Sequence, residues 1–240
     1  MLLTDAQRAA FSIAHATVKG GRKLLFESET AALPIRMNDA VSADDTIPQF
    51  GFVGKYYEAR KIAVIGINPG NGPDDHRTQS DEEMMPVLRR FVVEPNEATY
   101  AAASFAQARA FPFWLASKEI GPILEGEGIG ADEIAYANAC PYRAGSGESK
   151  DVFPNNRRMR LAADNWLSPL LDALTPNLVI AHGQKAAEVI MYCAVPGAPL
   201  VYNRSRNQRV RSAKNSYFVS RLRAALLHKT PNPDPSSARR

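Results

Sequence analysis

Four short apolar runs in this sequence each end in a residue whose side chain forms hydrogen bonds. The residues that follow these runs are Asn68, Asn138, His182 and Asn203. An asparagine amide carries a donor and an acceptor in one plane, without charge and without a useful titration. Three such amides around one crevice would bind a flat, neutral ring with paired donors and acceptors, such as the edge of a pyrimidine. They would not remove a proton.

The turn after the first run is rich in glycine and reads Gly66-Ile67-Asn68-Pro69-Gly70. Glycines between a strand and a helix are typical of phosphate-binding loops. This turn matches neither the Gly-x-Gly-x-x-Gly pattern nor the P-loop, because no Lys-Ser or Lys-Thr pair follows it. Pro69 also lacks the N–H that a phosphate would accept from. We therefore predict no nucleotide cofactor.

Ordinary structural roles compete with a functional one at each of these positions. Asn-Pro-Gly is also common turn chemistry, so Asn68 could be a turn former. Asn138 could cap the end of its strand, and His182 is best interpreted as a satisfied histidine at a helix start. The acidic and histidine side chains of residues 74–76 could form an acid–base pair, although loop solvation is the simpler interpretation.

Metal and disulfide chemistry have little support in the composition. Cys140 and Cys193 are the two cysteines, too few for a disulfide framework, a four-thiolate zinc site or an iron–sulfur cluster. The four histidines are not spaced as metal ligands are. They are His15, His76, His182 and His228. We predict neither a metal nor another cofactor.

The elements that must position these side chains alternate along the chain. Short β-branched runs predict strands, and 3.6-residue periodicity predicts helices between them. The strands are expected at residues 61–67, 134–138, 178–182 and 200–202, and the helices at 81–91, 98–118, 157–174, 183–193 and 215–228. This alternation predicts an α/β fold, a three-layer α/β/α arrangement with a central, mostly parallel four-stranded sheet. Ligands of such sheets bind beyond the carboxyl ends of the strands.

The two ends of the chain lack the alternation of strands and helices that is expected at its centre. Thr4 and Asp5 begin an amphipathic helix that Gly20 and Gly21 end, and a second helix is expected near residues 23–28. Residues 33–57 are expected to form a long loop. We predict one domain over residues 1–228, in which residues 1–60 are a helical and loop extension, and a flexible tail over residues 229–240.

Composition and charge narrow the class of protein. Hydrophobic residues make up 45% of the chain and charged residues 22%, values typical of soluble proteins. No leader and no membrane span is indicated, so we expect a cytoplasmic monomer.

The net charge of +4 is unevenly distributed along the chain, because residues 203–223 hold seven basic residues and no acid. Such a stretch fits a polyanion, or a solvated helix surface; its basic members are Arg204, Arg206, Arg209, Arg211, Lys214, Arg221 and Arg223.

Three of these motifs, in this order, resemble the uracil-DNA glycosylase superfamily. Residues 66–70 look like its first motif, in the Gly-Ile-Asn-Pro-Gly form of the mismatch-specific uracil/thymine branch. Residues 136–145, YANACPYRAG, resemble its second strand, which ends in a base-reading asparagine. Residues 165–190 resemble the helix, strand and Gly-x-x-Ala helix start that follow. The resemblance spans roughly residues 50–228.

The resemblance implies a hydrolase of base excision repair, which flips uracil or a related damaged base out of DNA and cleaves its N-glycosidic bond. Asn68 would hold the attacking water, and Asn203 would donate to a base carbonyl as charge develops there. Asn138 would read the base edge. The turn that binds the base would comprise Gly66, Ile67, Pro69 and Gly70. DNA is the implied partner. The four cysteines of the iron–sulfur branches are absent, so no cluster is implied.

The last motif of the family is altered in this chain. Asn203, Arg204 and Ser205 occupy the places of His-Pro-Ser, or of Asn-Pro-Ser in the mismatch branch. An amide in place of a histidine implies a slow enzyme. The residues expected to contact the DNA backbone are Arg204, Ser205, Arg206, Asn207 and Arg209.

Two alternatives to a glycosylase follow from the altered motif. One is a catalytically inactive nucleic-acid-binding module on the same fold, and the other is a hydrolase of free nucleosides or nucleotides. The aromatic residue that would stack on the base is left open between Phe91, Phe111 and Phe113.

Overall fold

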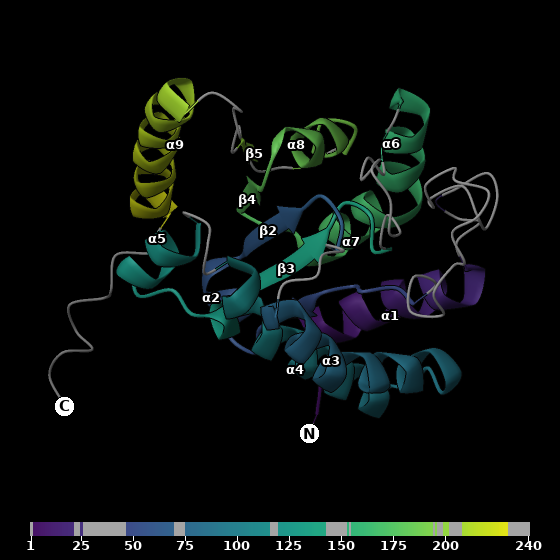
Figure 1. Cartoon of the computed structure of the whole chain (residues 1–240). Coiled ribbons are helices and arrows are strands. Elements are labelled where there is room, and N and C mark those ends of the chain that lie inside the picture. Colours follow the sequence, from purple (N-terminus) through teal and green to yellow (C-terminus); the bar gives the residue numbers. More distant parts are fainter. Residues whose placement is uncertain are drawn as a thin grey trace, which may run out of the picture.

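One mixed sheet forms the centre of the protein (Figure 1). The computed structural model describes residues 2–21, 25, 47–69, 75–115, 120–142, 153, 155–193, 195, 199–201 and 208–229. Within these residues the strand order is β1-β3-β2-β4-β5. The strands are β1 (Phe52–Val53), β2 (Ile62–Gly66), β3 (Ile134–Asn138), β4 (Leu178–Ala181) and β5 (Pro199–Val201).

The four predicted strands are confirmed, and they pair in parallel. The predicted three-layer α/β/α class is therefore confirmed as well. The short fifth strand, β1, pairs antiparallel with β3 at the edge of the sheet. It falls inside residues 33–57, so the prediction of an unbroken loop there was wrong. A two-residue strand carries too few residues for its alternation to be recognised in a sequence.

The helices cover the sheet and differ from the predicted ones mainly at their ends. The predicted first helix is confirmed, and Thr4 caps it in a capping box with Gln7. The predicted helix near residues 23–28 lies outside the described residues except for Leu25. The helices α2 and α5 were not predicted. The described helices are α1 (Asp5–Gly20), α2 (Tyr57–Arg60), α3 (Asp75–Val93), α4 (Glu97–Leu115), α5 (Ile120–Gly126), α6 (Asn156–Ala162), α7 (Ser168–Leu174), α8 (Gln184–Ile190) and α9 (Gln208–Lys229).

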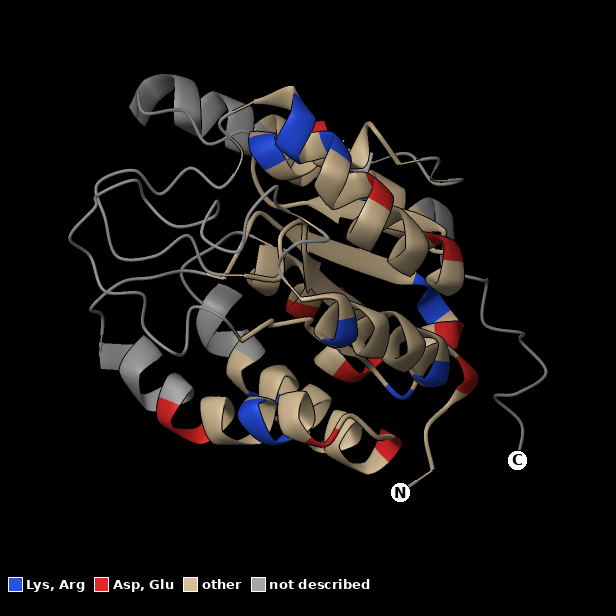
Figure 2. Cartoon of the chain, turned by 90° about the vertical axis from the view of Figure 1, so that its right-hand side faces the viewer, with Lys and Arg blue, Asp and Glu red and all other residues tan. Residues whose placement is uncertain are grey.

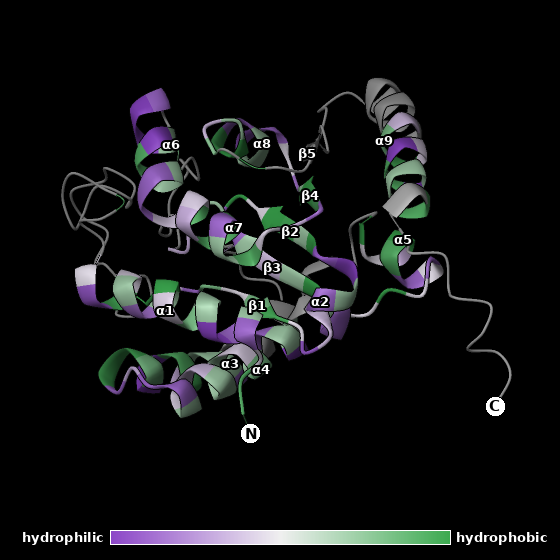
Figure 3. Ribbon diagram, turned by 180° about the vertical axis from the view of Figure 1, so that it is seen from behind, coloured by the Kyte–Doolittle hydropathy of each residue, from purple (hydrophilic) through white to green (hydrophobic). Residues whose placement is uncertain are grey.

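Two clusters of buried side chains hold the layers together, one on each face of the sheet. Ala63 and Ile65 point into the larger cluster, with α1, α3, α4 and α6–α8. Val64 and Tyr136 point into the smaller one, with α5 and α9. Strands covered on both faces are apolar throughout, and Figure 3 colours them mainly hydrophobic. Charged residues lie on the helices and loops, and none lies on a described strand (Figure 2).

The edge strand β1 is anchored by two buried glutamines. The side-chain amide of Gln107 on α4 pairs with both backbone groups of Gly51, which donates to Oε1 at 2.9 Å and accepts from Nε2 at 2.7 Å. Gln7 on α1 donates to the Val53 carbonyl at 2.9 Å. A covered edge cannot pair with another chain. The segment around β1 is thus part of the packed domain.

The strand order also determines where the sheet opens. The chain leaves β2 toward β3 on one side and later returns to β4 on the other. The strand order thus reverses at β2, and such a switch point is where ligands of open α/β sheets bind. Asn68 follows β2 at this point. In the described part of the chain, no helix is long and apolar enough to cross a membrane.

Candidate functional site

The strand register brings three of the four predicted strand-end residues to one edge of the sheet. Gly66 is the register partner of Asn138, and Ile65 that of Ala181. Backbone bonds continue past the strands, from Cys140 N to the Ile67 carbonyl at 2.9 Å and from His182 N to the Ile65 carbonyl at 2.8 Å. Asn68, Asn138 and His182 therefore follow three neighbouring strands at the switch point.

Several of the other predicted site residues are described by the structure only in part or not at all. Gly70, Asn203, Arg204, Ser205, Arg206 and Asn207 lie outside the described residues, and Arg209 lies in α9 with its side chain undescribed. Further along α9, Arg221 stacks over the Tyr217 ring at 5.7 Å. Arg223 pairs with Glu127 after α5 at 3.8 Å. Part of the basic stretch therefore takes part in contacts within the protein.

Asn138 is held on two sides at the end of β3. Only 3% of it is exposed. Its Oδ1 accepts a hydrogen bond from the Tyr136 hydroxyl at 3.1 Å, and its backbone carbonyl accepts one from the Trp166 indole at 2.8 Å. No described residue accepts from its Nδ2. The side chain bonds another side chain instead of capping the strand, and it leaves one buried amide donor for a ligand.

Tyr136 and Trp166 were missed as supporting residues. Tyr136 had a sequence signal, because residues two apart on a strand share a face. Trp166 had none. It lies in η4 (Ala163–Leu167), a π-helical turn that joins α6 to α7 without a break. Such turns insert an extra residue and recur at functional sites. The indole is fully buried and carries the bond to Asn138.

Gly66 is required by the Tyr136–Asn138 pair. A Cβ added at Gly66 would lie 2.8 Å from the Tyr136 hydroxyl oxygen and closer still to Asn138 Oδ1. Real Cβ atoms do not approach other atoms so closely. The glycine of the first motif thus leaves room for the hydrogen bond on the neighbouring strand.

Asn68 differs from Asn138 in its burial and in its hydrogen bonds. It is half-buried, and its Nδ2 donates to the Pro69 carbonyl at 2.9 Å. The bond is local, as expected for a turn former, and it uses the donor side of the amide. Among the described residues nothing donates to Asn68 Oδ1. One strand-end amide therefore has its acceptor available, and the other has its donor available.

The described side chains of Asn68, Asn138 and Tyr136 are polar and uncharged. Burial raises the pKa of Tyr136, more than its hydrogen bond to Asn138 lowers it, so the hydroxyl stays a neutral donor at physiological pH. His182 is half-buried. Residues 75 and 76 begin α3 with undescribed side chains, and Asp74 lies outside the described residues, so the acid–base alternative stays untested. The described His, Cys, Asp and Glu residues form no group of three that could hold a metal ion.

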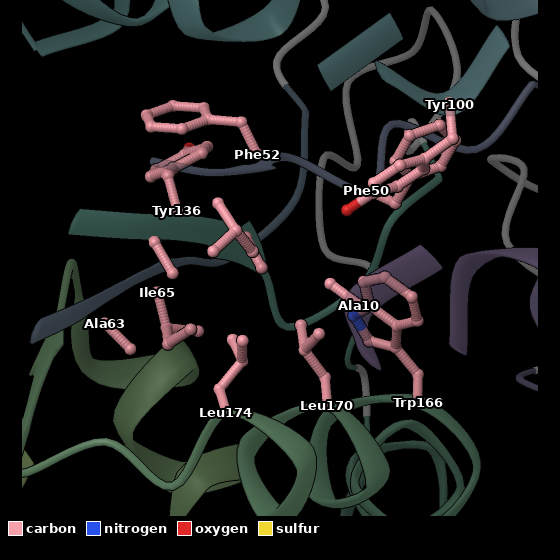
Figure 4. A pocket seen from close by; sticks show the side chains of 13 residues that line it. Ala10, Phe50, Phe52, Ala63, Ile65, Tyr100, Tyr136, Trp166, Leu170 and Leu174 are labelled. Atoms are coloured by element: carbon pink, nitrogen blue, oxygen red, sulfur yellow. The ribbon is translucent and has the colours of Figure 1, made fainter. Parts of the chain in front are cut away.

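A small cavity lies in the core beside the sheet (Figure 4). Tyr136, Trp166 and Leu170 line it, together with Phe50 and other apolar side chains. Its volume is about 10 Å³, room for one water molecule. Small-molecule sites are typically larger by more than tenfold. We interpret this cavity as a packing defect beneath the sheet.

The structure narrows the choice of a stacking aromatic residue. Phe91 is fully buried and packs against Phe50 and Tyr100, with ring centroids 4.9 and 5.8 Å away. It belongs to the core and cannot stack on a ligand without leaving it. Phe111 and Phe113 lie in α4, and their side chains are not described.

No protein-family model matches the sequence, and no curated protein sequence is significantly similar to it. The functional interpretation therefore rests on the chemistry of the strand ends.

Proposed function

We propose that this protein is a DNA glycosylase that hydrolyses the N-glycosidic bond of uracil or a related damaged pyrimidine. The observation that carries the proposal is the pair of strand-end amides at the switch point. Asn68 has its Oδ1 available as an acceptor, and Asn138 has its Nδ2 available as a donor. Hydrolysis of the N-glycosidic bond needs both functions, an acceptor that orients the attacking water and a donor that binds the departing base.

Each amide has a separate role in this reaction. Glycosidic bonds break through an oxocarbenium-like transition state, and negative charge then builds on the departing base. A fixed donor at a carbonyl oxygen of the base stabilises that charge in the manner of an oxyanion hole. Asn138 Nδ2 would supply this donor. Asn68 Oδ1 would accept from the attacking water and orient it, without taking its proton. A slow reaction follows.

The DNA would be held mainly through its phosphates. Taking a nucleotide out of the stack costs a few kcal/mol and is easiest at a mismatch or in a single strand. The basic residues from Arg204 to Arg209 would supply the salt-dependent part of the affinity. Asn203 would add a second donor to the base.

The direct test is excision of uracil. The protein is incubated with a uracil-containing single strand and with a G·U duplex, and abasic sites are then cleaved with alkali. We expect strand breaks with the wild type and a loss of about 10²-fold or more in rate for Asn68→Ala. Asn156→Ala, which changes an exposed asparagine on α6, serves as the matched control. Wild-type cleavage no higher than that of Asn68→Ala would refute the proposal.

The same proteins separate the two alternatives. A binding module without activity predicts salt-sensitive DNA binding that survives Asn68→Ala, with no strand breaks. A hydrolase of free nucleosides predicts activity that is unchanged when Arg204, Arg206 and Arg209 are all replaced by Glu. A DNA enzyme predicts that this charge reversal weakens cleavage most at low salt.

A further inference from the structure

An asparagine amide can read two opposite hydrogen-bond patterns. Uracil offers a donor at N3 and an acceptor at O4, whereas cytosine offers an acceptor at N3 and a donor at its amino group. A half-turn of the amide exchanges Oδ1 and Nδ2, and it therefore exchanges the pattern that the side chain matches. An asparagine that is free to turn accepts either base. Discrimination requires that the amide be held in one orientation.

Among the described residues, one hydroxyl holds the amide of Asn138. The Tyr136 hydroxyl donates to Oδ1 at 3.1 Å, which directs Nδ2 away from the tyrosine. After a half-turn the hydroxyl could accept from Nδ2, but it could no longer donate to Oδ1. Exchanging a matched hydrogen bond for another arrangement is costly inside a protein, and both residues are buried.

The surroundings hold both partners in place. The Tyr136 ring stacks on Phe52, with ring centroids 6.1 Å apart and planes inclined by 25°. Trp166 fixes the backbone of Asn138. Gly66 leaves the space that the hydroxyl and the amide oxygen share. The hydrogen bond therefore has little freedom to change its geometry.

We infer that Tyr136 is a positioning residue that makes Asn138 select pyrimidines with a carbonyl group at C4 over cytosine. This inference rests on the proposed function. With Nδ2 directed at the ligand, uracil presents O4 to a donor. Cytosine presents its amino group, so two donors face one another. Oδ1 keeps a second lone pair for the N3–H of uracil.

The test compares Tyr136→Phe with Tyr57→Phe. Both remove one buried hydroxyl. That of Tyr57 bonds the Leu174 carbonyl at 3.2 Å, just before β4 begins and away from the strand ends. The measurement is the ratio of affinities for single strands with one 2′-fluoro-2′-deoxyuridine or one 2′-fluoro-2′-deoxycytidine, whose glycosidic bonds resist hydrolysis. It does not require turnover.

We expect the wild type to prefer the uracil strand. We expect Tyr136→Phe to lower this preference on the order of tenfold to a hundredfold, while Tyr57→Phe leaves it unchanged. Gly66→Ala displaces the same pair by a different route and should lower the preference too, which covers the case that Tyr136→Phe does not fold.

Two results would overturn the inference: no uracil preference in the wild type, or an equal preference in the wild type and both site variants. A uracil preference that depends on Tyr136, with no excision in the alkali assay, would instead reject the proposed reaction and keep the role of Tyr136 in binding.

Discussion

Replacing Gly66 by alanine tests whether the glycine of the first motif exists to accommodate the pair on the next strand. The added Cβ would lie 2.8 Å from the Tyr136 hydroxyl oxygen and closer to Asn138 Oδ1. Neither side chain can move freely, since both are buried and bonded to each other. The backbone of Gly66 has no positive φ, so the conformation itself suits alanine.

The cost of this substitution is the sum of three effects. Forcing an extra methyl group into a packed site costs about 1–3 kcal/mol. Separating the hydroxyl from the amide leaves buried polar groups unpaired, at about 1–3 kcal/mol. Alanine restricts the unfolded chain and returns about 0.4–1 kcal/mol. We expect the free energy of unfolding to fall by about 1–5.5 kcal/mol, which lowers the melting temperature by roughly 2–22 °C for a chain of this size.

Urea unfolding measures the effect, with Gly126→Ala as the control. Gly126 ends α5, and no atom lies within 4 Å of its added Cβ, so this variant should be as stable as the wild type or slightly more stable. The decisive comparison places Gly66→Ala in an Asn138→Ala background. Removing Oδ1 removes the nearest clash, so the cost of Gly66→Ala should fall by about 1 kcal/mol or more. Equal costs in both backgrounds would refute the reasoning.

Three further predictions concern the support of the site and the sheet. Trp166→Phe removes the donor to the Asn138 carbonyl and should lower the free energy of unfolding in urea by about 1–3 kcal/mol; an unchanged midpoint would contradict a role for the indole N–H. Gln107→Ala leaves both backbone groups of Gly51 without their partners and should cost about 2–4 kcal/mol, whereas a cost below 1 kcal/mol would mean that this anchor of β1 is dispensable. Stability should also fall at alkaline pH, because burial raises the pKa of Tyr57, Tyr100 and Tyr136 above the usual value of about 10, so that the unfolded chain releases these protons first. The stabilisation is complete below about pH 10 and decreases above it by about 1.4 kcal/mol per pH unit for each tyrosine. The free energy of unfolding, measured from pH 9 to 11, should fall by one such increment less in Tyr136→Phe than in the wild type. An unchanged slope against pH would contradict the burial of Tyr136 as a neutral group.

The elements of the fold were predictable where a single periodicity extends over several residues. The runs that became β2, β3 and β4 are apolar on both faces, and this pattern marks a buried parallel strand in the sequence itself. β1, α2, α5 and the π-helical turn at Trp166 were missed. A two-residue strand, helices of four and seven residues and one inserted residue carry too little pattern to be recognised, and their conformations depend on the partners they pack against.

The same division holds for the candidate site. The sequence determined that amides follow the strands, because the positions of Asn68 and Asn138 after apolar runs are properties of the chain alone. It also determined that the site lacks the glycine and lysine pattern of a phosphate loop.

Only the tertiary structure decided which of these side chains lie at the same end of the sheet and which hydrogen bonds they already make. β2 lies between β3 and β4, an order that depends on contacts between residues far apart in the chain, so Asn68 lies at the switch point. The Tyr136 hydroxyl uses one lone pair of Asn138 Oδ1, and the Pro69 carbonyl uses one N–H of Asn68 Nδ2. Hydrogen-bond partners are chosen by distance in space, and the distance between two strand ends is set by the packing of the whole sheet.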